Sequence, residues 1–326
     1  MKHNEEGFIL VAIIWIIAIL TVLTLGLANR ALLDQRAAAL ALDHAQTQFL
    51  ARGAVQYAVA DMRNKAVTEA ILLQAREQAA AQGIPTSFRA DSVDPARGGK
   101  RIVSLSDQSE IFTPSSNDSA NTIGYSVSDA EARISLNTAT EELLDEIEGL
   151  SFSTVSAIMR YRGGELTPEE RHQFLSVEEG RFLEGVDEDD WEGSDGKPGL
   201  RELFTIYGEG RINLNSAPRD VLLAVPDLDD DVVDAIIAYR EGDDNKLNTS
   251  DDRSFRNLES IPAALGVDPT DLAPVAQYCT LQSQFFTITG FAAKRQGKVR
   301  AAAKAVVHLQ PGNAAILSWS EGELGP

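Results

Sequence analysis

A short acidic stretch late in the chain carries the side chains with the clearest capacity for binding chemistry. Within ten residues it offers six side chains with oxygen atoms: Asp243, Asp244, Asn245, Asn248, Asp251 and Asp252. A calcium ion takes about six to eight oxygen ligands and tolerates irregular geometry. The spacing is not that of an EF-hand, so two interpretations stay open, a calcium site and a solvated acidic loop.

A second candidate site lies where a polar leader meets an uncharged apolar run. Residues 7–29 contain no Asp, Glu, Lys or Arg, and residues 8–28 would form a helix of about 32 Å, enough to cross a bilayer core. An ordinary signal peptide would have a shorter apolar core and a small-residue cleavage site after it. The Gly7–Phe8 junction instead favours a prepilin-type leader, cut before the run, and a plain single-span anchor is the alternative.

No group of residues typical of an enzyme is recognisable. The four histidines are scattered without metal-ligand spacing, and the single cysteine, Cys279, can form no internal disulfide. We find no phosphate-binding loop, no nucleophile elbow and no cysteine pair. We therefore expect a protein that is not an enzyme.

The charge balance limits the partners. The chain of 326 residues has 49 acidic and 29 basic side chains, a formal net charge of −20. Such a chain repels phosphate backbones, so we expect no nucleic-acid partner. The length allows two domains beyond the anchor.

Helical signals follow the apolar run, and strand signals come later. Residues 30–65 are rich in strong helix formers and contain no proline, so they predict a continuation of the membrane helix. A second helix is predicted near residues 67–82. Residues 101–105 and 123–127 are typical of strands.

The middle of the chain contains an internal repeat with a period of 78 residues. Residues 131–164, which begin EARISLNTA, align without a gap with residues 209–242, which begin EGRINLNSA. Each copy predicts a short helix, a tight turn and a second helix that ends at Tyr-Arg, the pattern of a helix-hairpin-helix unit. Asn137-Thr138 and Asn215-Ser216 are predicted N-caps of the first helices.

Helix-hairpin-helix units often bind DNA through the backbone amides of a Gly-x-Gly turn. The second glycine of that turn is Ser151 in the first copy and Asp229 in the second, beside three more aspartates. Carboxylates at this position repel phosphate, so we interpret the repeats as packing modules.

The C-terminal part returns to strand signals. Residues 284–293 and 299–308 are rich in β-branched and aromatic residues and flank a Lys-Arg-Gln-Gly turn, which predicts an antiparallel hairpin. Residues 316–319 could add a short edge strand.

With these elements in order, the chain resembles the K-type minor pseudopilin of the type II secretion system, also called general secretion pathway protein K. The resemblance covers nearly the whole chain. It rests on the Gly-Phe start of the apolar helix, on the closing hairpin and on three segments: YSVSDAEARISLNTA (125–139), LFTIYGEGRINLNSAP (203–218) and AIIAYR (235–240).

The resemblance implies an α+β fold. A pilin-like unit would pack its long N-terminal helix on a small antiparallel sheet, with a large α-helical domain containing both repeats inserted between strands. The implied domains are a leader (1–7), a transmembrane segment (8–29), the pilin-like helix and first strands (30–128), the inserted domain (129–278) and the last strands (279–326).

The resemblance also implies functional residues near the N-terminus. A prepilin peptidase would cleave after Gly7, and Phe8 would become N-methylated. Most pilins and pseudopilins carry a glutamate at the fifth mature position, which is Ala12 here. K-type proteins similarly lack this acid, and a buried glutamate without a partner is unfavourable. Ala12 thus implies a place at the tip of the pseudopilus.

The function implied is that of an assembly protein. It would join the I- and J-type minor pseudopilins, prime the pseudopilus and support protein secretion across the outer membrane. The acidic loop would hold calcium as cofactor. The chain would cross the inner membrane of a Gram-negative bacterium once, with its bulk in the periplasm. The alternatives are a type IV pilus minor pilin and a membrane-anchored DNA-uptake protein that uses the repeats.

Overall fold

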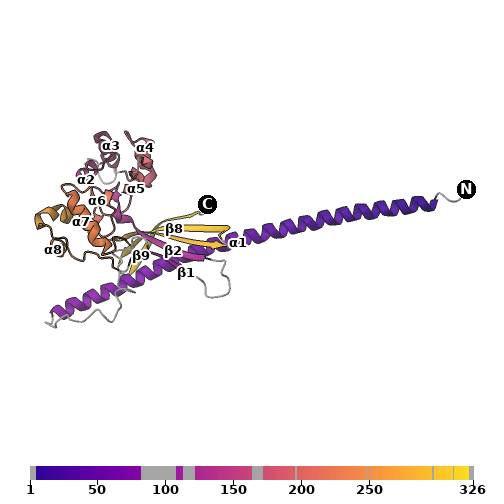
Figure 1. Ribbon diagram of the computed structural model, residues 1–326, viewed down its shortest axis with the longest axis horizontal. Coiled ribbons are helices and arrows are strands. Elements are labelled where there is room, and N and C mark those ends of the chain that lie inside the picture. The colour runs from indigo at the N-terminus through magenta and orange to yellow at the C-terminus, as the bar shows by residue number, and fades with distance from the viewer. Residues whose placement is uncertain are drawn as a thin grey trace.

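The computed structural model has two parts, an elongated one built on a single long helix and a compact helical one beside it (Figure 1). The structure describes residues 5–81, 108–112, 122–163, 172–194, 197–247, 249, 251–295, 297–310 and 312–322. The strand predicted at residues 101–105 and the candidate ligand Asn248 lie outside these residues.

Helix α1 (Glu5–Ala81) contains the apolar run and continues well beyond it. The helix predicted over residues 30–65 is confirmed, but the separate helix predicted at 67–82 is wrong, because this segment is the end of α1. Residues 54–81 contain no glycine or proline to interrupt the hydrogen-bond ladder. At the usual rise per residue, the 77 residues of α1 extend about 115 Å.

Five antiparallel strands form the main sheet, in the spatial order β1–β2–β7–β8–β9. Their bounds are Gln108–Phe112 (β1), Thr122–Asp129 (β2), Phe285–Lys294 (β7), Val299–Gln310 (β8) and Asn313–Gly322 (β9). The strand predicted at 123–127 and the C-terminal hairpin are confirmed. The predicted edge strand is also present and is longer than expected, whereas β1 is not among the predicted strands.

Helix α1 packs across one face of this sheet, mainly over β8 and β7. Its buried residues recur at helical spacing, and those of the strands alternate, as one-sided burial requires. The shared core contains Ala51, Ala54, Val55, Ala58, Met62, Tyr125, Val127, Phe286, Ile288, Ala303, Ala305 and Val307. The helix approaches β7 closely at Gly290, where an added Cβ would lie 2.3 Å from the carbonyl oxygen of Ala51.

The compact part is inserted between β2 and β7 and is built from short elements. Its helices are η3 (Ala130–Ala132), α2 (Glu141–Asp145), α3 (Phe152–Arg162), η4 (Val177–Phe182), α4 (Glu188–Glu192), α5 (Leu200–Leu203), α6 (Arg219–Leu222), α7 (Asp230–Glu241), η5 (Leu258–Ser260), α8 (Ile261–Leu265), η6 (Pro269–Leu272) and α9 (Ala273–Tyr278). These elements share one core that includes Trp191, Phe204, Leu136 and Leu214.

Two short parallel strand pairs complete the inserted part. β3 (Ile134–Ser135) pairs with β4 (Phe204–Thr205), and β5 (Ile212–Asn213) pairs with β6 (Cys279–Thr280). We expected the main sheet to resume at residue 279. It resumes at Phe285, because β6 stays paired with β5 of the inserted part.

The two sequence repeats fold alike. The first helices, α2 and α6, are shorter than expected, while the second helices, α3 and α7, run to Arg162 and one residue past Arg240. The turns between them adopt positive φ at equivalent positions, 92° at Gly149 and 58° at Asp227. The α+β prediction, with a long helix on an antiparallel sheet and an inserted helical unit, is confirmed.

The predicted N-caps are wrong. Thr140 caps α2 through its side chain, and α6 follows Pro218 without a side-chain cap. Asn137 and Asn215 instead bind backbone groups of distant segments. The amide of Asn137 donates to the carbonyl oxygens of Phe174 and Ile206 and accepts from Phe174 N.

Asn215 makes the equivalent set of bonds in the second repeat. It donates to the carbonyl oxygens of Phe255 and Leu281 and accepts from Phe255 N, with distances of 3.0, 3.1 and 2.8 Å. A side chain that satisfies distant backbone groups cannot also cap its own helix. The asparagine at this position of both repeats therefore holds distant backbone segments together and does not cap a helix.

Candidate functional site

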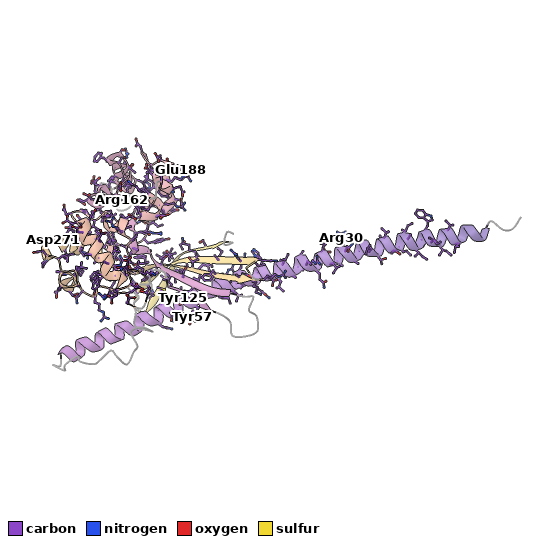
Figure 2. All side chains as sticks on the ribbon, in the orientation of Figure 1. Arg30, Tyr57, Tyr125, Arg162, Glu188 and Asp271 are labelled. Atoms are coloured by element: carbon purple, nitrogen blue, oxygen red, sulfur yellow. The ribbon has the colours of Figure 1, made fainter. Side chains whose placement is uncertain are left out.

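The start of α1 carries the residues predicted for processing. Gly7 and Phe8 lie inside the helix, which begins at Glu5. Ala12 is half-buried among its helical neighbours, whereas large apolar side chains around it, such as Trp15, are exposed. Among the described helices, α1 alone is long and apolar enough to cross a membrane, judged by length and composition. Arg30 marks the end of the uncharged run (Figure 2).

The acidic loop that follows α7 is organised around Asp251. One carboxylate oxygen of Asp251 accepts from the N–H groups of Asp243 and Asp244, at 2.7 and 3.1 Å. The other accepts from the hydroxyl of Thr249 at 2.7 Å. The Thr249 bond is the main cause that lowers the pKa of Asp251 to about 2, with the backbone donors adding to it.

The other acidic groups of this loop also have protein partners. Asp243 pairs with Arg253 at 2.7 Å, and Asp244 accepts from the backbone N–H of Lys246 at 2.9 Å. Asn245 occupies a turn with φ of 53°. In the part of the chain that the structure describes, no three acidic, histidine or cysteine side chains gather as metal ligands would. The loop as it stands does not converge on one centre, and calcium binding stays a prediction.

A buried carboxylate, that of Asp129, lies where the chain leaves the main sheet. One oxygen accepts from the hydroxyls of Ser216 and Ser283, both at 2.5 Å, and from the amide of Asn213 at 2.7 Å. The other accepts from the N–H of Glu131 at 2.8 Å. Asp129 thus joins the end of β2, the second repeat and the segment that leads back into β7. Burial raises the pKa of Asp129, and these hydrogen bonds oppose the rise.

Glu131 supplies a second carboxylate to the same junction. One of its oxygens accepts from the backbone N–H groups of Gln284 and Phe285, at 2.5 and 3.3 Å. Burial is the main cause that raises the pKa of Glu131, and the neighbouring charge of Asp129 raises it further. The two acids therefore tie the outgoing and returning chain connections to each other.

This junction is not among the sites predicted from the sequence, although the sequence contains a signal for it. Residues 125 to 129 alternate, so Asp129 shares a face with Tyr125 and Val127, which pack toward α1. An acid on the buried face of a strand needs partners. The side-chain partners of Asp129 come from residues 84 to 154 positions further along the chain, which the sequence pattern could not reveal.

Two equivalent arginines stabilise the repeats from within. Arg162 donates to the carbonyl oxygen of Ala139 at 2.8 Å, and Arg240 donates to that of Ala217 at 2.6 Å. Burial lowers the pKa of Arg240 to about 10. The Tyr-Arg ending of each repeat is therefore a structural feature that fixes the start of the first helix against the second.

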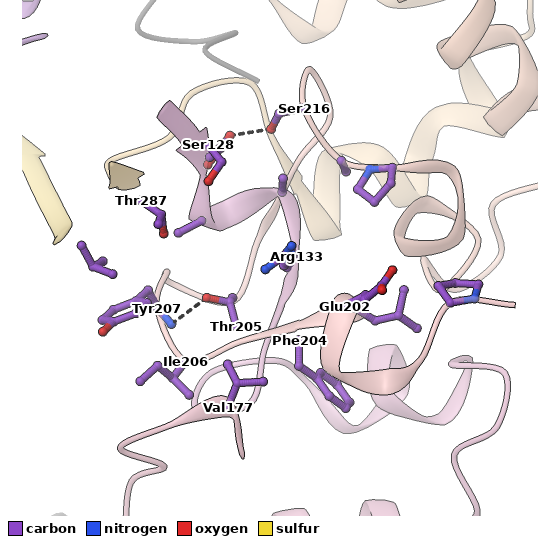
Figure 3. Close-up of a pocket in the computed structure, with 18 of the residues that line it drawn as sticks. Ser128, Arg133, Val177, Glu202, Phe204, Thr205, Ile206, Tyr207, Ser216 and Thr287 are labelled. Carbon is purple, nitrogen blue, oxygen red and sulfur yellow. Dashed lines mark hydrogen bonds between the residues drawn. The ribbon is translucent and has the colours of Figure 1, made fainter. Parts of the chain in front are cut away.

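An open cavity of about 880 Å³ lies between the main sheet and the inserted part (Figure 3). Its sheet side is the face turned away from α1, with four hydroxyl groups, one cation and one apolar side chain: Ser128, Thr287, Ser318, Ser320, Lys304 and Val306. Its other side includes Arg133, Glu178, Glu202, Thr205 and Tyr207. Apolar side chains such as Leu175, Phe204 and Ile206 also line the cavity, so its lining is mixed. An open cavity with both polar and apolar groups is compatible with an extended peptide.

The chain is similar in structure to a known protein. No protein-family model matches the chain, and no curated protein matches it. One similar solved structure is a chain in the crystal structure of the GspK-GspI-GspJ complex from the type 2 secretion system of enterotoxigenic Escherichia coli. The similarity covers 78% of this chain and 100% of that chain, with 13% sequence identity and a TM-score of 0.44.

Proposed function

We propose that this protein is a K-type minor pseudopilin of the type II secretion system. It occupies the tip of the pseudopilus, joins I- and J-type minor pseudopilins, primes assembly and supports secretion across the outer membrane. A prepilin peptidase removes the leader after Gly7, and Phe8 becomes the methylated N-terminus. The protein crosses the inner membrane once, and its sheet and inserted part lie in the periplasm.

The continuity of α1 is the observation that carries this proposal. The first part of α1 is uncharged and exposes its apolar side chains, while its later part packs on the sheet through Ala51, Val55 and Ala58. One helix thereby joins a membrane anchor rigidly to a folded unit. Such a subunit can pack against similar helices in the bilayer while its folded part stays in water.

Ala12 supports the position at the tip. The described apolar run offers no carboxylate that could neutralise the terminal amine of a neighbouring subunit. A subunit with no neighbour above it has no use for such a group, and an unpaired acid in the membrane is unfavourable. For this chain the partnership with I- and J-type subunits is our proposal.

Processing of the leader tests the N-terminal part of the proposal. We expect mass spectrometry of the chain, co-expressed with a prepilin peptidase, to show loss of the seven leader residues. Gly7→Ala should stay unprocessed, whereas the control Gly26→Ala, whose added Cβ meets nothing within 4 Å, should mature normally. A mature N-terminus in Gly7→Ala would contradict the leader assignment.

Formation of a complex with other minor pseudopilins tests the remaining part of the proposal. We expect the full chain in detergent micelles to form a stable complex with the I- and J-type minor pseudopilins encoded beside it. Neighbouring genes that encode a type IV pilus, together with binding to its minor pilins, would favour that alternative. A gel shift of duplex DNA at physiological salt would contradict the proposal and favour DNA uptake.

A further inference from the structure

Strand β9 lies at the edge of the main sheet. It pairs with β8 along one side, and no strand that the structure describes pairs with its other side. In an antiparallel arrangement, alternate residues direct their N–H and C=O groups away from the partner strand. The ten residues of β9 therefore present a row of backbone groups that another strand can bind.

This edge has few of the features that prevent strand pairing. Proteins usually protect edges with lysine, proline or short strands. The sequence NAAILSWSEG contains no lysine and no proline, and its one charge, Glu321, pairs with Arg52 at 2.5 Å. Ile316 and Leu317 are 41% and 48% exposed. The composition thus favours addition of a strand.

A bulge shows which part of β9 suits pairing best. Val306 lies opposite Ser318 and Val307 lies opposite Ile316, so Leu317 has no partner on β8. Bulges disturb the regular ladder. Residues 318–322 lie beyond this bulge in regular register and include Ser318 and Ser320, which line the cavity.

The two faces of this edge differ in chemistry. On the cavity face, Lys304 lies directly across from Ser320. No described acidic residue pairs with Lys304, nor with Arg133 on the opposite wall of the cavity. On the other face, Trp319 packs partly against the core beneath α1. An added strand would therefore meet a cation on one face and an apolar ring on the other.

The spacing allows Lys304 to reach an added strand. Neighbouring strands lie about 4.8 Å apart, so a strand beside β9 would be roughly 10 Å from β8. Ser320, which lies between the two strands, has a short side chain. An extended lysine side chain spans about 6 Å, and a glutamate side chain on the added strand can span the rest of the distance between β8 and that strand. A carboxylate on the cavity face of the added strand can thus meet the ammonium group of Lys304.

We propose that the edge of β9 at residues 318–322 is a strand-addition site for an extended segment of a partner protein. That segment alternates apolar residues, which cover Trp319, with polar ones, and places an acidic side chain beside Lys304. The proposal defines the partner by this chemistry alone. It does not depend on the proposed role in secretion.

Synthetic peptides test this proposal on the full chain in detergent micelles. The probe is a ten-residue peptide that alternates valine with threonine and glutamate. We expect it to bind and to slow amide hydrogen exchange at residues 318–322. A matched peptide with lysine in place of glutamate should bind roughly tenfold more weakly. A third peptide, N-methylated at alternate residues along one edge, should not bind because it cannot form the ladder.

A charge reversal in the protein completes the test. Lys304 is exposed, so Lys304→Glu should fold with an unchanged melting temperature. This substitution should weaken binding of the glutamate peptide roughly tenfold and strengthen binding of the lysine peptide. The proposal is overturned if the glutamate peptide does not bind or if the N-methylated peptide binds equally well. It is overturned as well if Lys304→Glu leaves the affinities of the peptides unchanged. It is also overturned if these amides become protected through self-association of the chain alone.

Discussion

The carboxylate of Asp129 accepts a hydrogen bond of 2.5 Å from the hydroxyl of Ser283, which lies 154 positions later in the chain. Asp129 is the last residue of β2, and Ser283 precedes β7, the neighbouring strand. The inserted part is thus attached at a junction where both chain connections share one buried acid. This contact joins the start of the inserted part to its end.

Asp129→Asn should destabilise the protein in a pH-dependent way. At neutral pH we expect a loss of about 1–3 kcal/mol, because an amide cannot accept all the donors that the carboxylate accepts. The pKa of Asp129 is raised in the folded state, so protonation favours folding. The stability of the parent protein relative to Asp129→Asn should therefore increase as pH falls from 7 through the raised pKa toward 3.8.

Urea unfolding of the full chain in micelles between pH 7 and pH 4 would measure this difference. Ser283→Ala is the matched control, since it removes one hydrogen bond and keeps the carboxylate. It should retain the pH dependence of the parent. A stability difference between the parent and Asp129→Asn that does not change with pH would contradict the assignment.

Gly290→Ala should weaken the packing of α1 on the sheet. The added methyl would lie 2.3 Å from the carbonyl oxygen of Ala51 and 2.7 Å from the side chain of Val55, and both belong to the packed helix. Overpacking of this kind costs about 1–3 kcal/mol. Thermal unfolding monitored by circular dichroism would detect it. Gly53→Ala on the exposed side of α1 meets nothing within 4 Å and should instead stabilise by about 0.5–1 kcal/mol.

The turns of the two repeats should respond oppositely to substitution. Asp227 is exposed and adopts φ of 58°, a region that glycine occupies more readily, so Asp227→Gly should stabilise by about 0.5 kcal/mol. Gly149→Ala, at the equivalent position with φ of 92°, should destabilise by about 1 kcal/mol. Paired denaturation curves would compare the two, and effects of the same sign would refute the structural equivalence of these turns.

Calcium binding by the acidic loop can be tested by melting temperature. If the loop binds the ion, added calcium should raise the melting temperature by mass action and a chelator should reverse the rise. Asp251→Ala should lose most of this response, because Asp251 organises the loop through Thr249, Asp243 and Asp244. Glu146→Ala, an exposed acid outside the loop, should keep it. The same melting temperature with and without calcium would favour a solvated acidic loop.

Several elements of the fold can be predicted from local patterns in the sequence. The uncharged run and the helix formers after it account for α1, and alternation accounts for β2, β7 and β8. The 78-residue repeat determined that two similar helical units occur. These signals depend on neighbours a few residues apart, so they can be read without knowledge of the fold.

Which polar residues bind one another depends on contacts between segments that are distant in the sequence. Asn137 and Asn215 resemble helix caps in the sequence, yet they bind backbone groups 37 to 69 positions away. Among residues near it in the sequence, Asp129 bonds to Glu131. Ser283 becomes its partner only because the fold brings the two ends of the inserted part together. The position of β9 at the edge of the described strands likewise follows from the strand order and not from its own residues. Such contacts join segments that only packing brings together, and a buried polar group is stable solely when those segments meet.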